Sequence, residues 1–437
     1  MRNEPIITVG ILSAPEIRFR LDGNFYSPLQ PSFSDTEECV TAQEGQLVWK
    51  NSRFSELRFS PQNEESDFFT LFNVSIGIRF HWERKEAQSF RGSLLLLPDK
   101  DQVLAINVIN IENYLKSVIA SEMNGNAPKA FLKAHAVISR SWLLAQIEKK
   151  GKPQPEKIKS DNCNNTYIKW YDREDHSLFD VCADDHCQRY QGITRTLSPQ
   201  VINAVEETRG EALVYENKVC DTRFSKCCGG ITEEFQYCWE NSEHPYMPSV
   251  TDRPNTPILL ANEAETESFI RSQPQAFCSN PSKEILQQVL NNYDCETTDF
   301  YRWSKSYTQA ELSALLFQKT GIDFGNIEAI TPLKRGKSGR IYELEIIGSL
   351  HKAVFGKELE IRRILSESHL YSSAFTVSVE KVNNDKFPQR FTLHGAGWGH
   401  GVGLCQIGAA VMGSKGFGYD EILKHYYPPA TLKQLYE

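Results

Sequence analysis

The sequence lacks several features that would assign it to a simple class of protein. None of its 437 residues belongs to a run of eighteen apolar residues, so no segment is expected to span a membrane as a helix. It has no low-complexity tract and no collagen or heptad repeat, which excludes fibrous and coiled-coil proteins. Basic residues are not in excess, because 48 Lys and Arg stand against 56 Asp and Glu and the net charge is −8. A nucleic-acid partner is therefore not expected.

A signal peptide is not recognisable in the sequence either. The first residues, Met-Arg-Asn-Glu-Pro-Ile-Ile-Thr-Val-Gly, contain only a short apolar run, which Glu4 precedes, and no clean small-residue cleavage site follows it. What the sequence does have is enough length to bury a large core and to form two or three domains.

The order of the patterns predicts an α+β fold. Residues 1–90 are predicted to be a β-rich N-terminal region without recognisable chemistry, because short β-branched and aromatic runs alternate with turn-forming pieces. Residues 91–261 and 321–437 are predicted to form one mixed sheet-and-helix domain, and residues 262–320 a helical insertion. Strands are expected at Ile6–Ile11, Gln46–Lys50, Phe68–Val74, Ile76–Trp82, Ser93–Leu97, Val103–Ile109, Glu211–Tyr215, Lys218–Phe224, Ile341–Ile347, Phe375–Glu380 and Arg390–His394, and helices at Pro199–Thr208, Ser282–Asn291, Gln309–Lys319 and Leu404–Met412.

A pair of helices is predicted over residues 110–150. Leu115, Val118 and Ile119 share one face of the first helix at helical spacing, and Glu122 continues that apolar face. Burial penalises the charged form of a carboxyl group, so we expect the pKa of Glu122 to be raised. A general acid that works near neutral pH requires such a shift. The alternative is that Glu122 caps a helix end or forms a salt bridge.

The second helix is predicted to begin at Pro128 and to end near Lys149, before Lys-Gly. Its inner face carries small residues that allow close packing. Arg140 stands among them and supplies a fixed positive charge eighteen residues after Glu122.

Cysteine is the unusual component of this sequence. Eleven cysteines are present, an odd number, so at least one is free, bound to metal or paired outside the chain. They cluster between residues 163 and 238, which indicates a local site. His176, Cys182 and Cys187, with His186 as a spare imidazole, form a ligand set that suits zinc by type. A disulfide and reduced buried thiols are the alternatives.

Residues 394–403, His-Gly-Ala-Gly-Trp-Gly-His-Gly-Val-Gly, carry glycine at every second position. So many glycines indicate a sharply turning main chain or a closely approaching ligand. Nucleotide binding is not indicated, because His400 stands where G-x-G-x-x-G requires glycine and no Walker lysine follows. A structural turn between strand and helix is the alternative. His394, Trp398, His400 and Gln406 add hydrogen-bonding and sugar-stacking groups, so we interpret the loop as one wall of a substrate groove.

These segments together resemble a known family. Ala120-Ser121-Glu122-Met123, followed by Lys133 to Val137 and by Arg140, is similar to the stage II sporulation protein D and amidase enhancer family (the SpoIID/LytB domain). The resemblance covers about residues 92–437, most weakly between about 262 and 300. Two departures are Asn124, where the family usually has proline, and His135, where it usually has glutamine.

Further short motifs follow in the order that the family shows. The glycine loop resembles its Gly-x-Gly-x-Gly-His-Gly-x-Gly-x-x-Gln-x-Gly signature, with Cys405 at a position where serine is more usual. The loop from Cys228 to Glu233, Cys-Gly-Gly-Ile-Thr-Glu, resembles a third landmark, and Ser338-Gly339-Arg340 a fourth. Adjacent cysteines do not readily ligate one metal ion, so the Cys227–Cys228 pair is not itself interpreted as a zinc motif.

The resemblance implies an enzyme of the bacterial cell wall, a lytic transglycosylase that cleaves peptidoglycan glycan strands and leaves a 1,6-anhydro product. It implies that Glu122 and Arg140 are catalytic, and that the domain that carries them is the catalytic domain. No cofactor is required for this chemistry, although some family members hold a metal with one histidine and two cysteines, so a structural zinc ion is expected at His176, Cys182 and Cys187. The residues expected to bind substrate are Lys226, Cys228, Gly229, Gly230, Thr232, His394, Trp398, His400 and Gln406.

Other interpretations of the sequence stay open. Asp221 and Glu233 are candidates for a second carboxylate, and Arg223 and Lys226 could offer positive charge to an oxyanion. A binding module that grips wall glycan and enhances an amidase is the main alternative to an enzyme. A cysteine hydrolase that uses Cys228 or Cys405 is a third reading, with no supporting motif. The family implies glycan strands and a wall amidase as partners, and the cell envelope or periplasm as location.

Overall fold

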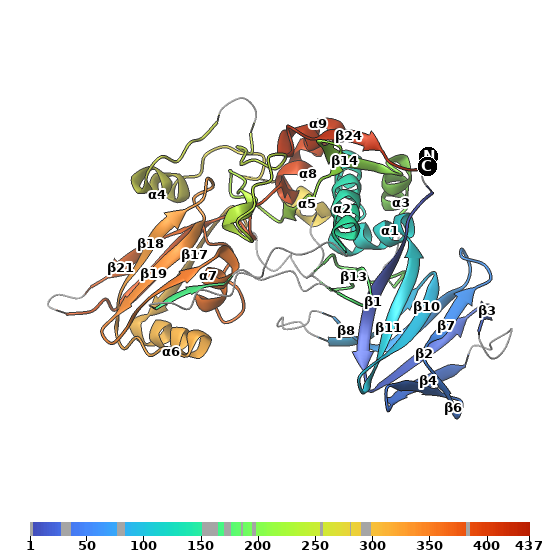
Figure 1. Cartoon of the computed structure of the whole chain (residues 1–437). Helices are drawn as coiled ribbons and strands as arrows, with labels where there is room; N and C mark the ends of the chain where they lie inside the picture. The colour runs from blue at the N-terminus through green and yellow to red at the C-terminus, as the bar shows by residue number, and fades with distance from the viewer. Residues whose placement is uncertain are drawn as a thin grey trace. The chain divides into compact units, whose positions relative to one another are not determined.

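The computed structural model describes residues 3–27, 36–76, 84–150, 165–169, 176–184, 187–194, 198–253, 257–279, 281–289, 299–381 and 385–437. The chain divides into two compact units. Unit 1 contains residues 1–150, 173–212 and 433–437, and unit 2 contains residues 151–172 and 213–432. The expected α+β class is confirmed, because helices and sheets occur in both units (Figure 1).

Unit 1 contains two six-stranded sheets. One has the strand order β13-β1-β11-β10-β7-β3 and the other β6-β5-β4-β2-β8-β9. The bounds of the strands are β1 Ile6–Ala14, β2 Glu16–Asp22, β3 Phe25–Tyr26, β4 Glu37–Gln43, β5 Gln46–Trp49, β6 Ser52–Phe54, β7 Leu57–Pro61, β8 Phe68–Ile76, β9 Arg84–Phe90, β10 Ser93–Asp99, β11 Gln102–Asn110 and β13 Val181–Cys182. Strand β11 pairs antiparallel with both β1 and β10, and its residues 103–106 are all buried, so it is a central strand.

Three helices complete unit 1: α1 Ile111–Glu122, α2 Lys129–Lys149 and α3 Pro199–Glu207. Helix α1 follows β11 directly and ends at Glu122, as predicted. Pro128 is the N-cap residue of α2, so this helix begins one residue after its predicted start. Most of α2 is buried, including both apolar and polar side chains. The helix pair is therefore an internal part of unit 1, and a change of charge within it is costly.

Unit 2 contains most of the remaining strands: β12 Thr166–Ile168, β15 Lys218–Val219, β16 Phe224–Ser225, β17 Arg302–Thr308, β18 Ile327–Arg335, β19 Ile341–Gly348, β20 Lys352–Gly356, β21 Phe375–Glu380, β22 Arg390–Ala396 and β23 Leu404–Cys405. One sheet has the order β12-β20-β19-β18 and another β17-β22-β21, and the short strands β16 and β23 pair in parallel. Its helices are α4 Glu263–Arg271, α5 Lys283–Val289, α6 Gln309–Thr320, α7 Glu358–Ile364, α8 Gln406–Ser414 and α9 Tyr419–Tyr426, with a 3-10 turn at Phe235–Tyr237. A shared apolar core that includes Leu316, Ile341 and Phe391 joins α6 to these sheets.

Strands β14, Glu211–Tyr215, and β24, Thr431–Gln434, carry the chain from unit 1 to unit 2 and back. The predicted boundary at residue 90 falls inside unit 1, between β9 and β10. The predicted insertion, residues 262–320, lies in unit 2, where its strand β17 pairs with β22. The helices of residues 112–150 and the strands of residues 341–394, which the sequence analysis assigned to one domain, belong to different units.

Most of the predicted elements are present, with bounds that differ by a few residues. The strand expected at Lys218–Phe224 is wrong in extent, because only β15 and the start of β16 are extended there. The helix expected from Leu404 begins at Gln406, after β23. Residues 77–82 of the strand expected at Ile76–Trp82 lie outside the described residues, as do Cys163 and His186. No helix in the described ranges is long and apolar enough to cross a membrane.

Candidate functional site

The carboxylate of Glu122 lies at the C-terminal end of α1, half-buried rather than enclosed. The backbone N–H of Arg189 donates a hydrogen bond of 3.1 Å to its Oε1 atom. The C-terminal end of a helix disfavours negative charge, so this amide provides compensation where the helix does not. Glu122 therefore has both a fixed orientation and access to the surface.

A buried ion pair fixes the first turn of the same helix. Arg140 is fully buried, and its Nε and Nη2 atoms donate to the two oxygens of Glu112 at 2.9 and 2.7 Å. The Gly210 amide and the Tyr436 hydroxyl also donate to Glu112, and Arg140 Nη1 donates to the Glu211 carbonyl. This network ties α1 and α2 to the start of β14 and to the end of the chain.

The network also sets the charge of Glu112. Burial alone would raise its pKa, but the charge and hydrogen bonds of Arg140, with the hydroxyl of Tyr436, outweigh burial and lower it. The donors of Arg140 reach Glu112 and backbone carbonyl groups. The guanidinium group of Arg140 therefore binds Glu112, a residue that was not predicted from the sequence, and not Glu122. No local pattern marks this pair in the sequence.

The three predicted metal ligands do converge in unit 1. The ligand atoms of His176, Cys182 and Cys187 all lie within 4.8 Å of one another, and neither cysteine is in a disulfide. The distance from His176 Nε2 to Cys187 Sγ is 3.5 Å. Tetrahedral zinc with ordinary bond lengths separates a nitrogen and a sulfur ligand by about 3.6 Å. The donor set and its spacing therefore fit a zinc ion.

Two features join this cluster to the end of α1. Arg189, whose amide holds Glu122, follows Cys187 by only two residues. Tyr114 of α1 is fully buried, and its hydroxyl has no hydrogen-bond partner within the described part of the chain. Its pKa is raised well above the usual value, first by burial and then by the nearby side chains of Cys187 and Cys182. Glu122 and the predicted metal ligands thus lie in one neighbourhood.

The glycine-rich loop of unit 2 encloses the guanidinium group of Arg340. Arg340 is almost fully buried and donates to the carbonyl oxygens of Gly399 and Cys228 and to Ser338 Oγ. A Cβ atom on Gly401, whose φ is +78°, would stand 2.3 Å from the Cζ atom of Arg340. Glycine is therefore required here for close packing around a cation, which is a structural use of the motif.

The loop also pairs with the segment that begins at Cys227. Cys227 and Trp398 exchange two backbone hydrogen bonds, of 3.1 and 2.8 Å, and the Glu233 amide donates to the Gly401 carbonyl at 2.9 Å. Two motifs that the sequence separates by about 170 positions are thus adjacent in unit 2.

The residues predicted to bind substrate divide into two groups. Cys228, Gly229, Gly230, Thr232 and Gln406 are buried, which leaves little of them for a glycan to contact. The others, Lys226, His394, Trp398 and His400, are partly exposed. Trp398 packs against the rings of Phe300 and Tyr371. Burial and the positive charges of Arg223, Arg340 and Arg362 lower the pKa of His400 well below the usual value, so it stays neutral.

Glu233 is the more unusual of the two candidate second carboxylates. It is fully buried and accepts from Ser338 Oγ at 2.6 Å and from the Glu234 amide at 2.9 Å. Burial raises its pKa to about 7, although these donors and the charge of Arg340 act in the opposite direction. Asp221 instead forms an ion pair with Arg223 at 2.9 Å. A surface pocket of about 730 Å³ in unit 2 is lined by residues that include Ile231, Glu234, Arg253 and Lys337.

Comparison with known proteins now gives this geometry a context. Residues 99–215 match the family model described as Stage II sporulation protein, and residues 233–403 match a domain of unknown function, DUF8618. The first match contains Glu122, Arg140 and the three predicted metal ligands. The second contains Glu233, Arg340 and the glycine loop.

Several relatives extend over most of the chain. An uncharacterized protein of Brachyspira hyodysenteriae is 26% identical over 90% of this chain and 81% of its own length. The stage II sporulation protein D of Bacillus subtilis is 23% identical over 80% of this chain and 82% of its own length. The amidase enhancer of B. subtilis is 26% identical over 73% of this chain, which spans only 40% of that relative. The resemblance to the stage II sporulation protein D and amidase enhancer family is confirmed.

Proposed function

We propose that this protein is a lytic transglycosylase that cleaves the glycan strands of peptidoglycan between muramic acid and glucosamine sugars. The family match and the named relatives support a function related to the bacterial cell wall. The particular reaction is the proposal. We also propose that it acts in the cell envelope or periplasm, where its substrate would be found.

The arrangement of Glu122 carries this proposal. Its carboxylate is oriented by the Arg189 amide, stays accessible at the end of α1, and lies within the segment that matches the sporulation family. A catalytic acid needs these two properties together, because it must hold one geometry and still reach the substrate.

One carboxyl group is sufficient for the proposed reaction. The protonated Glu122 gives its proton to the glycosidic oxygen as the bond to the anomeric carbon breaks. The C6 hydroxyl of the muramic sugar then attacks that carbon and gives its proton back to the glutamate. The ring closes without water, so the second carboxylate of ordinary glycosidases is not required. Glu233 and Asp221 therefore need no role in the bond-breaking step.

Arg140 acts in this scheme as a positioning residue. It holds Glu112 in the first turn of α1, and Glu122 ends the same helix. Because α1 is rigid, the ion pair at one end fixes the direction of the carboxylate at the other. Loss of Arg140 should therefore reduce activity through the placement of α1 and should also reduce stability.

His176, Cys182 and Cys187 would hold a zinc ion beside this site. A zinc ion with three protein ligands keeps a fourth position that can polarise a bound oxygen. The protein's own contribution is to hold the ligands and, through the backbone of residues 187–189, the orientation of Glu122. We propose a structural role for the metal, since the glutamate alone accounts for the proton transfers.

The substitution Glu122→Gln tests the function. The amide keeps the shape of the side chain but cannot donate a carboxylic proton, so cleavage of peptide-free glycan strands should fall by about two to four powers of ten. Mass spectrometry of 1,6-anhydro ends measures cleavage, and co-sedimentation with the glycan measures binding, which should persist. Glu206→Gln, which removes the charge of an exposed glutamate on α3, is the matched control and should cleave at the parent rate.

A glycan-binding protein that enhances a wall amidase is the second candidate, and the similarity to an amidase enhancer favours it. In that case Glu122→Gln and the parent protein would produce the same amount of anhydro ends, near zero. The parent protein would instead increase the release of peptides by an added wall amidase. Equal anhydro product from both proteins at a measurable rate would show that Glu122 is not the acid.

A further inference from the structure

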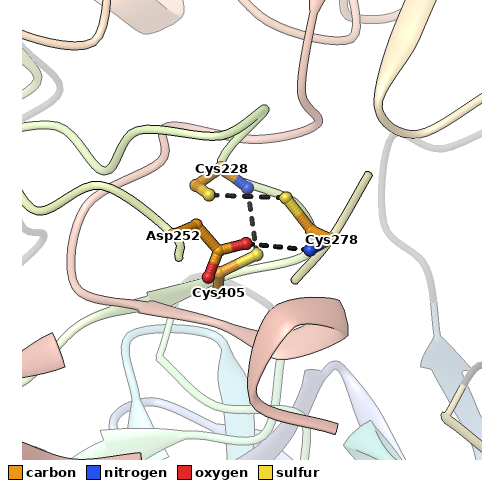
Figure 2. Close-up of side chains that lie close together, drawn as sticks. All are labelled: Cys228, Asp252, Cys278 and Cys405. Carbon is orange, nitrogen blue, oxygen red and sulfur yellow. Dashed lines mark hydrogen bonds between the residues drawn. The ribbon is translucent and has the colours of Figure 1, made fainter. Parts of the chain in front are cut away.

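Four side chains of unit 2 form a second convergent group that no part of the proposed reaction uses. Cys228, Asp252, Cys278 and Cys405 meet in the interior, each at most 2% exposed, and their ligand atoms all lie within 4.8 Å of one another (Figure 2). They come from four segments that are distant in sequence. Cys228 lies in the loop after β16, and Asp252 follows Thr251. Cys278 lies in the turn between α4 and α5, and Cys405 is the last residue of β23.

The spacing suits a single tetrahedral ion. The Sγ atoms of Cys228 and Cys278 are 3.7 Å apart. Two thiolates on one tetrahedral zinc ion, with bonds of about 2.3 Å, are separated by about 3.8 Å. In a four-iron cluster each cysteine binds a different iron atom, which spreads the sulfur atoms further. The group is therefore compact enough for one ion.

Hydrogen bonds orient two of the four ligands, Cys405 and Asp252, in the way that metal sites require. The Cys228 amide donates to Cys405 Sγ at 3.2 Å, and the Cys278 amide donates to Asp252 Oδ2 at 2.9 Å (Figure 2). The hydroxyl of Tyr426 donates to the other oxygen of Asp252 at 2.6 Å. Such outer partners set the direction and basicity of metal ligands.

A glycine makes room for the carboxylate. A Cβ atom on Gly408 of α8 would stand 2.5 Å from Asp252 Oδ1 and 2.5 Å from the hydroxyl of Tyr426. The backbone of α8 can therefore approach this pair closely only because position 408 has no side chain. The helix that begins just after Cys405 is thus shaped around the same site.

Asp252 has no cationic side chain to neutralise it. Its two oxygens accept from the Cys278 amide and the Tyr426 hydroxyl, and it forms no ion pair within the described ranges. The guanidinium group of Arg302 donates its hydrogen bonds to backbone carbonyl oxygens, including those of Gly229 and Phe269. An anionic carboxylate in such a place is costly unless a cation accompanies it.

We propose that Cys228, Asp252, Cys278 and Cys405 bind one zinc ion that links four segments of unit 2. Three sulfur donors select a soft or borderline metal, and four protein ligands close the coordination sphere, which is the pattern of a structural site. Because the site is buried, the ion holds the loop of residues 227–233 against the start of α8 and does not contact substrate.

The metal content of the purified protein tests this inference. The variants Cys278→Ser and Asp252→Asn, expressed without added chelator, should each contain one zinc equivalent per chain less than the parent protein. Elemental mass spectrometry measures this content. The measured quantity is the difference from the parent protein, so it does not depend on whether His176, Cys182 and Cys187 also hold zinc. Cys220→Ser, a buried cysteine outside the group, is the matched control and should keep the parent content.

A second readout leaves all four proposed ligands unchanged. Cobalt bound to the chelator-treated parent protein should show thiolate-to-cobalt charge-transfer bands with tetrahedral visible bands. These bands should persist in Cys187→Ser, which changes the other cluster. Chelation should speed amide hydrogen exchange around residues 228, 252 and 278, because metal binding contributes to folding free energy.

Three results would overturn the inference. Equal zinc content in the parent protein, Cys278→Ser and Asp252→Asn would show that the group binds no metal. Alkylation without reductant could instead reveal a disulfide between Cys228 and Cys278, which would make the pair a covalent link. Cys227 lies close enough to interact with Cys278 and Cys405. Loss of zinc in Cys227→Ser with retention in Asp252→Asn would contradict the assigned ligand set.

Discussion

The two units bury carboxylates in opposite ways. In unit 1, Glu112 is enclosed together with Arg140, and its pKa is lowered although burial acts to raise it. In unit 2, Glu233 is equally enclosed but forms no ion pair within the described residues, and its pKa rises to about 7. Arg340 is near, yet its donors go to carbonyl oxygens and to Ser338. Burial alone therefore does not decide the charge of a buried acid, because the geometry of the nearest cation decides it.

This difference gives the two units opposite responses to pH. Glu112 has a lowered folded pKa, so its contribution to stability is present above about pH 4.5 and is lost as the pH falls through the folded value. Glu233 has a raised folded pKa, so its contribution is present below about pH 4.5 and is lost as the pH rises through about 7. Hydrogen exchange measured peptide by peptide can follow the two units separately.

The largest expected effect comes from breaking the ion pair of unit 1. Arg140→Met leaves Glu112 buried without a cation, which should destabilise the protein by about 3–5 kcal/mol. The double variant Arg140→Met/Glu112→Gln removes both charges and should cost less than the sum of the two single variants. Urea unfolding measures these values. Additive costs would mean that the two residues are not coupled, and the contrast with unit 2 would fail.

Removing the charge of Glu233 should flatten the pH response of unit 2. The pKa of Glu233 is about 7 in the folded protein and 4.5 as its ordinary value. The parent protein should therefore lose about 3 kcal/mol of stability as the pH rises from 4.5 to about 7. Glu233→Gln cannot ionise, so the protection factors (exchange corrected for its intrinsic pH dependence) of the peptides that contain residues 233 and 338 should become independent of pH in this window. The neighbouring Glu234→Gln is the control and should keep the parent slope. A slope that survives in Glu233→Gln would assign it to another group.

A smaller effect tests how tightly the glycine loop encloses Arg340. Gly401→Ala places a Cβ atom against the guanidinium group at a positive φ, so we expect a loss of about 2–3 kcal/mol. Gly416→Ala has a similar φ of +88° but open space around it, and should show only the backbone part, about 1 kcal/mol. Equal melting temperatures for the two variants would mean that the loop can shift to accommodate the added Cβ atom without loss of stability.

The smallest effect should be the same in both units. Thr308 caps α6 in unit 2 through a capping box with Glu311, and Ser198 caps α3 in unit 1 through the Val201 amide. Replacing either by alanine should cost about 1 kcal/mol at any pH between 5 and 8, because a hydroxyl cap does not titrate. Differential scanning calorimetry measures both. A cost that changed with pH in one variant would indicate that its cap is linked to a charged network.

The helix pair was predictable because its ends are encoded locally. Pro128 and the Lys-Lys-Gly sequence after residue 148 mark α2, and the apolar spacing before Glu122 marks α1. Strand β2, residues 16–22, was missed although Ile17, Phe19 and Leu21 alternate with charged residues. That signal was present, and charge on the exposed face concealed it.

The partners of the site residues were not predictable in the same way. Arg140 meets Glu112 at a separation of 28 residues and, through it, Tyr436 at the end of the chain. The glycine loop was interpreted as a sugar-binding wall, because nothing in it indicates Arg340, which it encloses. Cys278 stands in the region where the sequence pattern was weakest, so the group around Cys228 had no visible signature. The role of Glu122 in catalysis stays a prediction.

Glu112 is contacted by both ends of the described chain. Its amide donates to Glu4, and its carboxylate accepts from Tyr436, which follows every residue of unit 2. During synthesis unit 1 must therefore wait with an incomplete interior while the whole of unit 2 is made and begins to fold. A protein shortened by a few residues after Gln434 would keep every element of the proposed site and yet leave this buried carboxylate one donor short.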